Sequence, residues 1–307
     1  MYIKKCNGKY GDVNKYNNYG GGITMAEIMK GMEVVEEIKE KMLREVEELK
    51  ARGITPGLAI VRLGAKPDDL AYERSAIKRC EGIGIACRVF EYPEDMTQAD
   101  LAQEISKIND DSTIHGILLF RPLPKHIDED IIKHVVSPEK DVDCLNPVNV
   151  AKVFEGDPTG FAPCTPEAVM EMLHHYGIPV KGKRVVVIGR SMVVGKPVSM
   201  LLLKEHGTVT ICHTRTKNIE EICGQADILV AAAGSARMVT DDFVSKGAVV
   251  IDVGINVDEE GKLVGDVDFE RVEKVAGHIT PVPGGVGTVT SSVLAKHVIQ
   301  AAQRQNP

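Results

Sequence analysis

The sequence predicts an α/β protein of two domains, of which the C-terminal one is a Rossmann-like, doubly wound parallel sheet. The first observation is the stretch RVVVIGRSMVVGKPVSMLLL at 184–203, which indicates a buried strand, a glycine-flanked loop and a helix. The second is that strands and helical segments continue to alternate after this stretch, which is typical of parallel pairing. The third is a similar alternation before it, which indicates a second α/β domain in a chain of 307 residues.

The loop at 189–197 is the first candidate binding site. Gly189 lets the chain turn sharply off the strand, and Pro197 fits the first turn of a helix. A helix N-terminus beside a strand end offers N–H groups and a partial positive charge, which suit a phosphate. The spacing differs from the usual G-x-G-x-x-G, and an ordinary strand-to-helix turn can look the same, so the loop alone does not establish a nucleotide site.

The strands expected after the loop lie at 208–213, 227–233, 248–254 and 278–282, with a helix at 219–226. Ligands of such sheets bind at the carboxyl ends of the strands, and these ends are rich in small and polar residues. The second strand ends in the residues HTRTK at 213–217, without the carboxylate that typically binds the ribose of NAD. Together with Arg190, these groups favour NADP over NAD, although such loop charges are often only solvated.

A similar alternation is expected in the first half of the chain. Apolar side chains recur at helical spacing from Val34 to Leu49, with Glu and Lys between them, as in an amphipathic helix packed on a sheet. Further helices are expected at 70–82, 98–108, 128–136 and 166–176, and strands at 58–63, 87–92 and 116–120, whereas 148–154 has no clear pattern. A last helix at 290–303 is expected to return to the first domain.

These elements divide the chain into a leader at 1–24, a first domain at 25–165 completed by a C-terminal helix at 288–307, and a nucleotide-binding domain at 166–287. The leader is rich in Asn, Tyr and Gly and lacks the apolar core of a secretory signal, so we expect a flexible segment, with Met25 as an alternative start. A cleft between two α/β domains is a common place for two substrates to meet.

Composition narrows the class of protein further. The net charge of −7 argues against nucleic acid or an anionic membrane as the main partner. No apolar run approaches the roughly 18–20 residues that span a bilayer. The seven cysteines form no C-x-x-C pair, so no metal site is expected, and their odd number fits a reducing cytoplasm.

Seven motifs occur in order along the chain: EKDVD (139–143), PCTP (163–166), GRSMVVGKP (189–197), TVTICHTRT (208–216), VIDVGIN (250–256), VGDVDF (264–269) and TPVPGGVGTVT (280–290). With these motifs the chain, from about Met25 to its C-terminus, resembles the methylenetetrahydrofolate dehydrogenase/cyclohydrolase family of one-carbon metabolism. The resemblance implies a two-domain α/β fold, usually a homodimer, with NADP in the C-terminal domain and a folate in the interdomain cleft.

The resemblance also implies site residues. Tyr72 would lie against the folate and Asp143 would bind its pterin ring through two N–H bonds, and these two are the catalytic candidates. The substrate-binding set is Tyr72, Phe120, Arg121, Asp143, Pro283, Gly284 and Gly285. The cofactor-binding set is Gly189, Arg190, Ser191, Gly195, Pro197, His213, Thr214, Arg215, Gly234, Ile255 and Gly287. Hydride transfer from the methylene carbon to the nicotinamide needs mainly alignment, which the glycines and prolines at 281–287 suit.

Two departures from the family pattern are informative. Ala76 stands where the family has a lysine, and Phe120 stands where it has a glutamine. The cyclohydrolase reaction requires proton transfer, and neither an alanine nor a phenylalanine side chain can transfer a proton. General acid–base catalysis of this kind is worth roughly 10²–10⁴-fold in rate. We therefore expect hydride transfer with weak or lost cyclohydrolase activity. Thr288, where proline is common, has no evident explanation.

Three other interpretations stay open. The chain could be the ordinary bifunctional enzyme, with Arg121 or Tyr72 acting in place of the lysine, although an arginine stays charged and is a poor proton carrier. It could be a folate- or nucleotide-binding protein without activity, against which the two complete loops argue. Another Rossmann dehydrogenase is the least supported, because no His–carboxylate pair is evident in these motifs.

Overall fold

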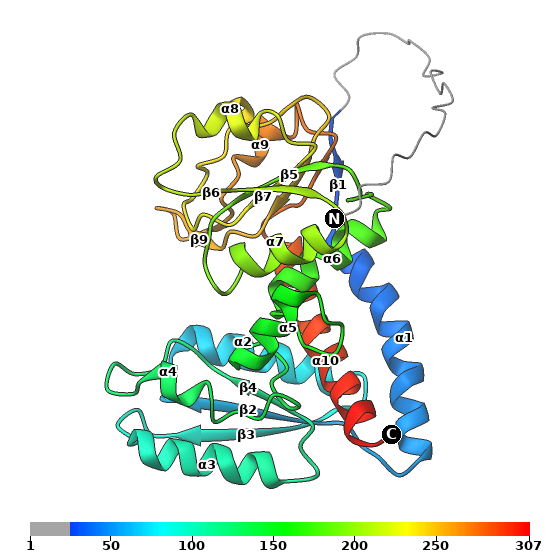
Figure 1. The fold of residues 1–307 in the computed structure, drawn as a ribbon, viewed down its shortest axis with the longest axis vertical. Coiled ribbons are helices and arrows are strands. Elements are labelled where there is room, and N and C mark those ends of the chain that lie inside the picture. Colours follow the sequence, from blue (N-terminus) through cyan, green and yellow to red (C-terminus); the bar gives the residue numbers. More distant parts are fainter. Residues whose placement is uncertain (1–24) are drawn as a thin grey trace, which may run out of the picture.

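The computed structural model of the chain describes residues 25–307, so the leader expected at 1–24 lies outside the described residues. A three-stranded parallel sheet forms the centre of the N-terminal domain, with β2 (Gly57–Leu63) between β3 (Ala86–Tyr92) and β4 (Gly116–Leu119). Helices α2 (Pro67–Glu81) and α3 (Gln98–Asp110) lie on opposite faces of this sheet (Figure 1). β2 is buried throughout because it is central and covered, whereas the edge strand β3 exposes several side chains.

A six-stranded sheet forms the C-terminal domain, in the order β1–β11–β8–β7–β5–β6. Its strands, all parallel to their neighbours, are β1 (Glu27–Ile28), β5 (Arg184–Ile188), β6 (Thr208–Cys212), β7 (Ile228–Ala231), β8 (Val249–Asp252) and β11 (His278–Ile279). The chain passes from β5 to β6 on one side and then to β7 on the other, so the strand order reverses at β5. Ligands of doubly wound sheets bind at such a reversal. The predicted fold class is confirmed.

The remaining elements of this domain are short. They are α7 (Gly195–Lys204), α8 (Ile219–Cys223), the 3₁₀ turn η1 (Asp241–Phe243), α9 (Phe269–Val272) and an antiparallel pair, β9 (Asn256–Val257) with β10 (Leu263–Val264).

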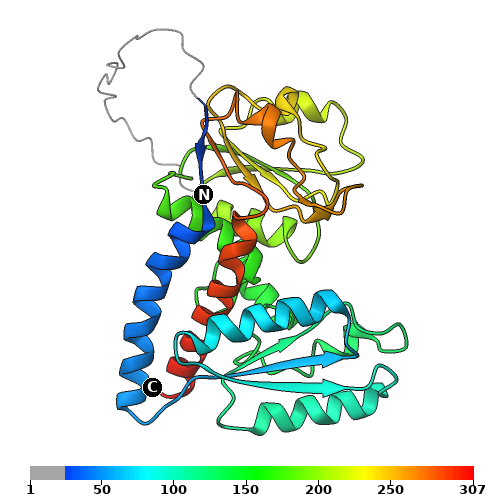
Figure 2. The same ribbon diagram turned by 180° about the vertical axis from the view of Figure 1, so that it is seen from behind.

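Three helices join the domains. α1 (Gly31–Ala51), α6 (Cys164–His175) and α10 (Val286–Gln305) pack against one another. α1 and α10 run side by side along the long axis in both ribbon views (Figures 1 and 2). One hydrophobic cluster includes Ile60 of β2, Val187 of β5 and Leu294 of α10. The two sheets are therefore connected by packed side chains rather than by a loose linker. Within residues 25–307, no helix is long and apolar enough to cross a membrane.

Several boundaries differ from those expected. The segment 148–154 is a helix, α5 (Pro147–Glu155), because the Asn146 side chain accepts from the N–H of Val148 and proline occupies the first position. The helix expected at 128–136 is one turn, α4 (Glu129–Ile132), after which the chain forms tighter i→i−3 turns. The strand expected at 278–282 ends at Ile279, before two prolines that lack the N–H a ladder needs.

Candidate active site

The end of β4 places two of the predicted substrate-binding residues. Phe120 follows β4, and its N–H donates to the main-chain oxygen of Val61 at 2.9 Å. The segment before Asp143 runs beside β4, because Ile117 and Asp141 form a parallel bridge. This register brings Asp143 level with the end of β4. Two motifs more than 20 residues apart in the sequence therefore meet at one edge of the sheet.

Tyr72 of α2 completes this group. Its ring lies 5.7 Å from that of Phe120, centroid to centroid. Burial, together with the nearby Cys164 thiol and Asp143 carboxylate, raises the pKa of Tyr72 well above its ordinary value, although 37% of the residue surface is exposed. The phenol is therefore neutral at physiological pH. The structure thus brings Tyr72, Phe120 and Asp143 together.

Ala76 and Phe120, which depart from the family pattern, are both buried among apolar side chains. Ala76 is 0% exposed and Phe120 8% exposed, and both belong to the cluster that joins the domains. Arg121, the next residue after Phe120, forms an ion pair with Glu129 at 3.2 Å. Its guanidinium is therefore partly neutralised by a carboxylate of α4.

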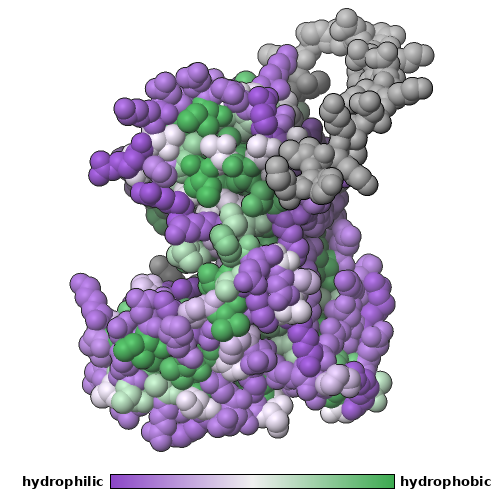
Figure 3. All heavy atoms as spheres, in the orientation of Figure 1, coloured by the Kyte–Doolittle hydropathy of each residue, from purple (hydrophilic) through white to green (hydrophobic). Residues whose placement is uncertain are grey.

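A pocket of about 350 Å³ lies between the domains. Five predicted residues of the C-terminal domain line it: Ile255, Pro283, Gly284, Gly285 and Gly287. From the N-terminal domain, Ser75 and Arg79 of α2 face them across it. The surface is hollowed between the two domains on the side shown in Figure 3. Sequence reasoning missed Ser75 and Arg79, although their helical spacing of three and seven residues from Tyr72 is a usable signal.

The loop between β5 and α7 requires its glycines. Gly189 has φ +122°, and a Cβ on it would lie 2.1 Å from the oxygen of Ala232. A Cβ on Gly195 would lie 2.3 Å from the oxygen of Gly189. The Ser191 hydroxyl accepts from the N–H of Val194 at 3.0 Å, and Pro197 is buried in the first turn of α7. Some N–H groups at this helix start therefore already have partners inside the loop, which differs from the free groups expected.

The basic residues of the predicted cofactor site follow the ends of two neighbouring strands. β5 and β6 are neighbours, and the N–H of Gly189 donates to the oxygen of Cys212 at 2.8 Å. Arg190 and Arg215 follow these adjacent strand ends, and both are exposed. In the part of the chain that the structure describes, neither forms an ion pair. Thr214 is exposed beside them, and the N–H of Arg215 donates to Nδ1 of His213 at 3.1 Å.

Two buried carboxylates, for which the sequence analysis gives no role, hold the main chain at the ends of β7 and β8. Asp266 accepts from the N–H groups of Ala233, Gly234 and Ser235, which follow β7, at 2.6–3.0 Å. Asp252, at the end of β8, accepts from three other N–H groups. Burial raises the pKa of Asp252 to about 6, against the effect of these hydrogen bonds. Gly234 is thus placed by Asp266.

Comparison with known proteins finds matches for both halves of the chain. Residues 29–143 match the model of the tetrahydrofolate dehydrogenase/cyclohydrolase catalytic domain, and residues 163–306 match that of the NAD(P)-binding domain of the same enzymes. The Bifunctional protein FolD of Clostridioides difficile is 58% identical over 92% of this chain and 99% of its own length.

Two solved structures have the same fold. The bifunctional methylenetetrahydrofolate dehydrogenase/cyclohydrolase of Campylobacter jejuni has a TM-score of 0.89 and 40% identity, over 91% of this chain and 99% of that one. The Trypanosoma brucei enzyme, complexed with NADP and an inhibitor, has a TM-score of 0.86 and 39% identity, over 92% and 98%. The chain belongs to the tetrahydrofolate dehydrogenase/cyclohydrolase family.

Proposed function

We propose that this protein oxidises methylenetetrahydrofolate to methenyltetrahydrofolate with NADP as hydride acceptor. The single observation that carries the proposal is the interdomain pocket, in which the glycine- and proline-rich turn at 281–287 faces the helix that carries Tyr72. This turn comes from the NAD(P)-binding domain, and the helix comes from the catalytic domain. Two ligands, one held by each domain, would meet there.

The chain's own residues supply binding and orientation. Tyr72 would lie along the folate, and Asp143 would accept N–H bonds from its pterin ring, which together fix the ring in two directions. Gly284 and Gly285 permit the close approach of main chain to flat rings. The bound nicotinamide would accept the hydride, a step that requires no protein acid or base.

The residues present fit a phosphorylated dinucleotide. The main chain at Gly195 lies so close to Gly189 that a Cβ on Gly195 would overlap it. The loop therefore offers main-chain groups rather than side chains to a ligand, at the point where the strand order of the sheet reverses. Arg190 and Arg215 would face a 2′-phosphate, and the presence of NADP in the Trypanosoma brucei structure supports this choice over NAD.

The cyclohydrolase activity is the second candidate function. Relatives named as bifunctional, at 58% identity, favour the ordinary bifunctional enzyme over the loss of hydrolysis expected from Ala76 and Phe120. If this chain hydrolyses the methenyl product, the proton carrier is not a lysine at position 76. Tyr72, whose raised pKa keeps it protonated, and Arg121 are the candidates. A homodimer and a cytoplasmic location stay predictions.

One comparison tests the proposal. The purified chain is given methylenetetrahydrofolate with NADP or NAD, and reduction of the cofactor is followed by absorbance. In a separate assay, the disappearance of methenyltetrahydrofolate measures hydrolysis against its spontaneous rate. NADP reduction with slower NAD reduction is the expected result. Tight binding of both ligands without turnover would instead support the folate-binding protein without activity.

A further inference from the structure

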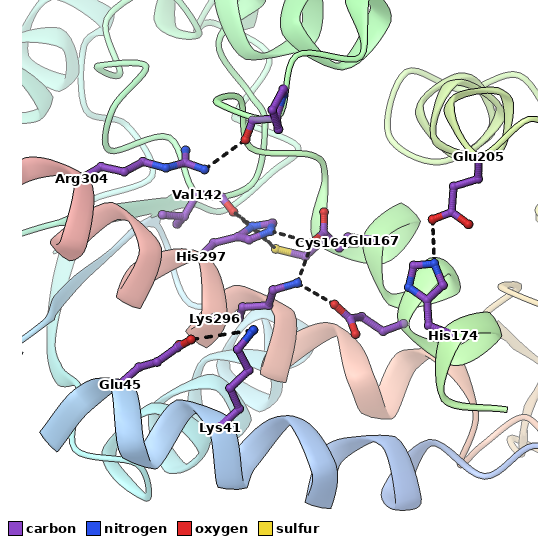
Figure 4. Close-up of polar contacts among 12 residues, drawn as sticks. Lys41, Glu45, Val142, Cys164, Glu167, His174, Glu205, Lys296, His297 and Arg304 are labelled. Atoms are coloured by element: carbon purple, nitrogen blue, oxygen red, sulfur yellow. Dashed lines mark hydrogen bonds and ion pairs between the residues drawn. The ribbon is translucent and has the colours of Figure 1, made fainter. Parts of the chain in front are cut away.

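A set of polar side chains is buried where α10 packs on α6, outside the residues that line the interdomain pocket (Figure 4). His297 of α10 is 1% exposed, and Cys164 of α6 is also buried. Nδ1 of His297 lies 2.8 Å from the main-chain oxygen of Val142, and the Cys164 thiol donates to the same oxygen at 3.4 Å. A carbonyl oxygen can only accept, so Nδ1 of His297 carries the hydrogen and donates it.

This oxygen belongs to the peptide that leads into Asp143, the proposed folate-binding carboxylate. The main-chain N–H of Cys164 donates to Oδ1 of Asp143 at 2.9 Å. On the other side, the Asp141 carboxylate accepts from the N–H groups of Leu145 and Asn146, both at 2.8 Å. The segment 141–146 is therefore held from both directions, with Asp143 in the middle and half-buried.

The backbone in this segment is strained. Cys144, directly after Asp143, has φ +57°, which is the left-handed region that residues other than glycine rarely adopt. Such a conformation is unfavourable and persists only where the surroundings fix it. Loss of one of the bonds that hold the segment would let it relax, and Asp143 would move with it.

The His297 ring has a fixed orientation. It packs on the ring of Phe161, with centroids 5.3 Å apart, and its Nε2 lies 3.7 Å from Oε1 of Glu167. Burial alone would raise the pKa of Glu167, but its contact with His297 and its ion pair with Lys296 hold that pKa well below the ordinary value. Glu167 is therefore a fixed negative charge on the far side of the ring, and Nδ1 stays directed at Val142.

We infer that His297 is a positioning residue for folate: its Nδ1–H bond to Val142 fixes the peptide that orients the Asp143 carboxylate. The inference rests on the proposed function, because it assumes that Asp143 binds folate. His297 lies apart from the glycine- and proline-rich turn at 281–287, although α10 begins in that turn, at Val286, and reaches His297 about three turns later. The effect is therefore expected on the folate side alone.

Two amide variants separate the bond from the bulk of the side chain. His297→Asn puts an amide nitrogen where Nδ1 is, so the bond to Val142 can persist. His297→Gln puts it nearer the position of Nε2, so a polar group stays but the bond is lost. We expect His297→Gln to raise KM for methylenetetrahydrofolate about three- to tenfold, as the loss of one buried hydrogen bond implies, with KM for NADP unchanged. We expect His297→Asn to stay close to the parent chain.

Lys296→Gln is the matched control. Lys296 is adjacent on the same helix and pairs with Glu167 and Glu171 at 2.9 and 2.6 Å, but it does not contact Val142. The variant Lys296→Gln should lower the Tm of the protein without changing KM for methylenetetrahydrofolate. The inference is overturned if both His297 variants behave alike, if Lys296→Gln raises KM for folate as much as His297→Gln, or if KM for NADP rises with it. A parent chain that does not oxidise methylenetetrahydrofolate would refute the proposed function instead.

Discussion

The ring of Phe120 lies against the ring of Tyr72, with the centroids 5.7 Å apart and the planes inclined by 45°. Phe120 can orient the Tyr72 ring, but its side chain offers no hydrogen bond. Ala76, one turn after Tyr72 on α2, is buried in the same cluster as Phe120. The two positions that carry a lysine and a glutamine in the family pattern are therefore filled with packed hydrocarbon. An apolar surface of this kind can align a flat ring but cannot transfer a proton.

The first prediction concerns the restoration of both polar groups. The double variant Ala76→Lys, Phe120→Gln should raise methenyltetrahydrofolate hydrolysis by at least about tenfold, because a positioned general acid–base contributes roughly 10²–10⁴-fold. Burial would lower the pKa of the new amine, which suits a proton carrier. The rate is measured as loss of methenyl absorbance above the spontaneous rate, with hydride transfer as the control. Little gain in hydrolysis would support the bifunctional enzyme that uses another residue.

The second prediction concerns Tyr72. We expect Tyr72→Phe to lower any hydrolysis by roughly tenfold or more and hydride transfer by much less, because only hydrolysis needs a proton from the phenol. The raised pKa of Tyr72 implies that hydride transfer shows no titration of this group between pH 6 and 9, within the usual range of assays. Both rates are measured on the same preparation. Equal losses in both would indicate that Tyr72 acts by orientation alone.

Local patterns were sufficient to predict most of the fold. The continuous apolar runs of β2 and β5 identify strands that are buried on both faces, and the helical spacing in α1 identifies a helix with one buried face. β1 was missed because its two residues, Glu27 and Ile28, are a strand only through their pairing with β11, about 250 residues away along the chain. No local signal reports such a pairing.

Some features of the candidate site can likewise be predicted from local sequence, whereas others depend on contacts between distant parts of the chain. The pattern of a strand, a glycine-flanked loop and a helix points to Gly189 and Gly195 in the sequence. The structure adds the physical reason, because main-chain contacts exclude a Cβ at both positions. The sequence does not indicate the roles of Asp252, Asp266 and His297. Each of these side chains acts through hydrogen bonds with main-chain groups that only the folded chain brings near. A buried acid in a strand motif looks the same in the sequence whether it binds a ligand or holds a loop.

The third prediction concerns the choice of cofactor. The double variant Arg190→Ala, Arg215→Ala should raise KM for NADP by roughly tenfold or more and leave KM for NAD nearly unchanged, because only NADP carries a 2′-phosphate, with which we expect these exposed guanidiniums to pair. Arg184→Ala is the control, since Arg184 lies at the opposite end of β5. Initial rates with each cofactor give both constants. A parallel rise for NAD and NADP would contradict the assignment.

The last prediction concerns stability and pH. Asp252 has a pKa of about 6 in the folded chain against an ordinary value of 3.8. The folded chain therefore binds more protons than the unfolded chain between these values. Because stability rises with pH only where the unfolded state binds more protons, this carboxyl lowers the free energy of unfolding as pH rises from about 4 to 6, by up to about 3 kcal/mol.

Below pH 4 this contribution is fully present, and above pH 6 it is lost. Other carboxylates, such as Asp111, whose pKa is lowered to about 2, act in the opposite direction, so the test is a difference between two chains. Urea unfolding of the parent and of Asp252→Asn from pH 4 to 7 gives that difference. Because an amide does not titrate in this range and accepts fewer N–H bonds, the variant should be less stable at every pH. Its deficit should be largest near pH 4 and should shrink toward pH 6, whereas a constant deficit would mean that Asp252 is ionised throughout.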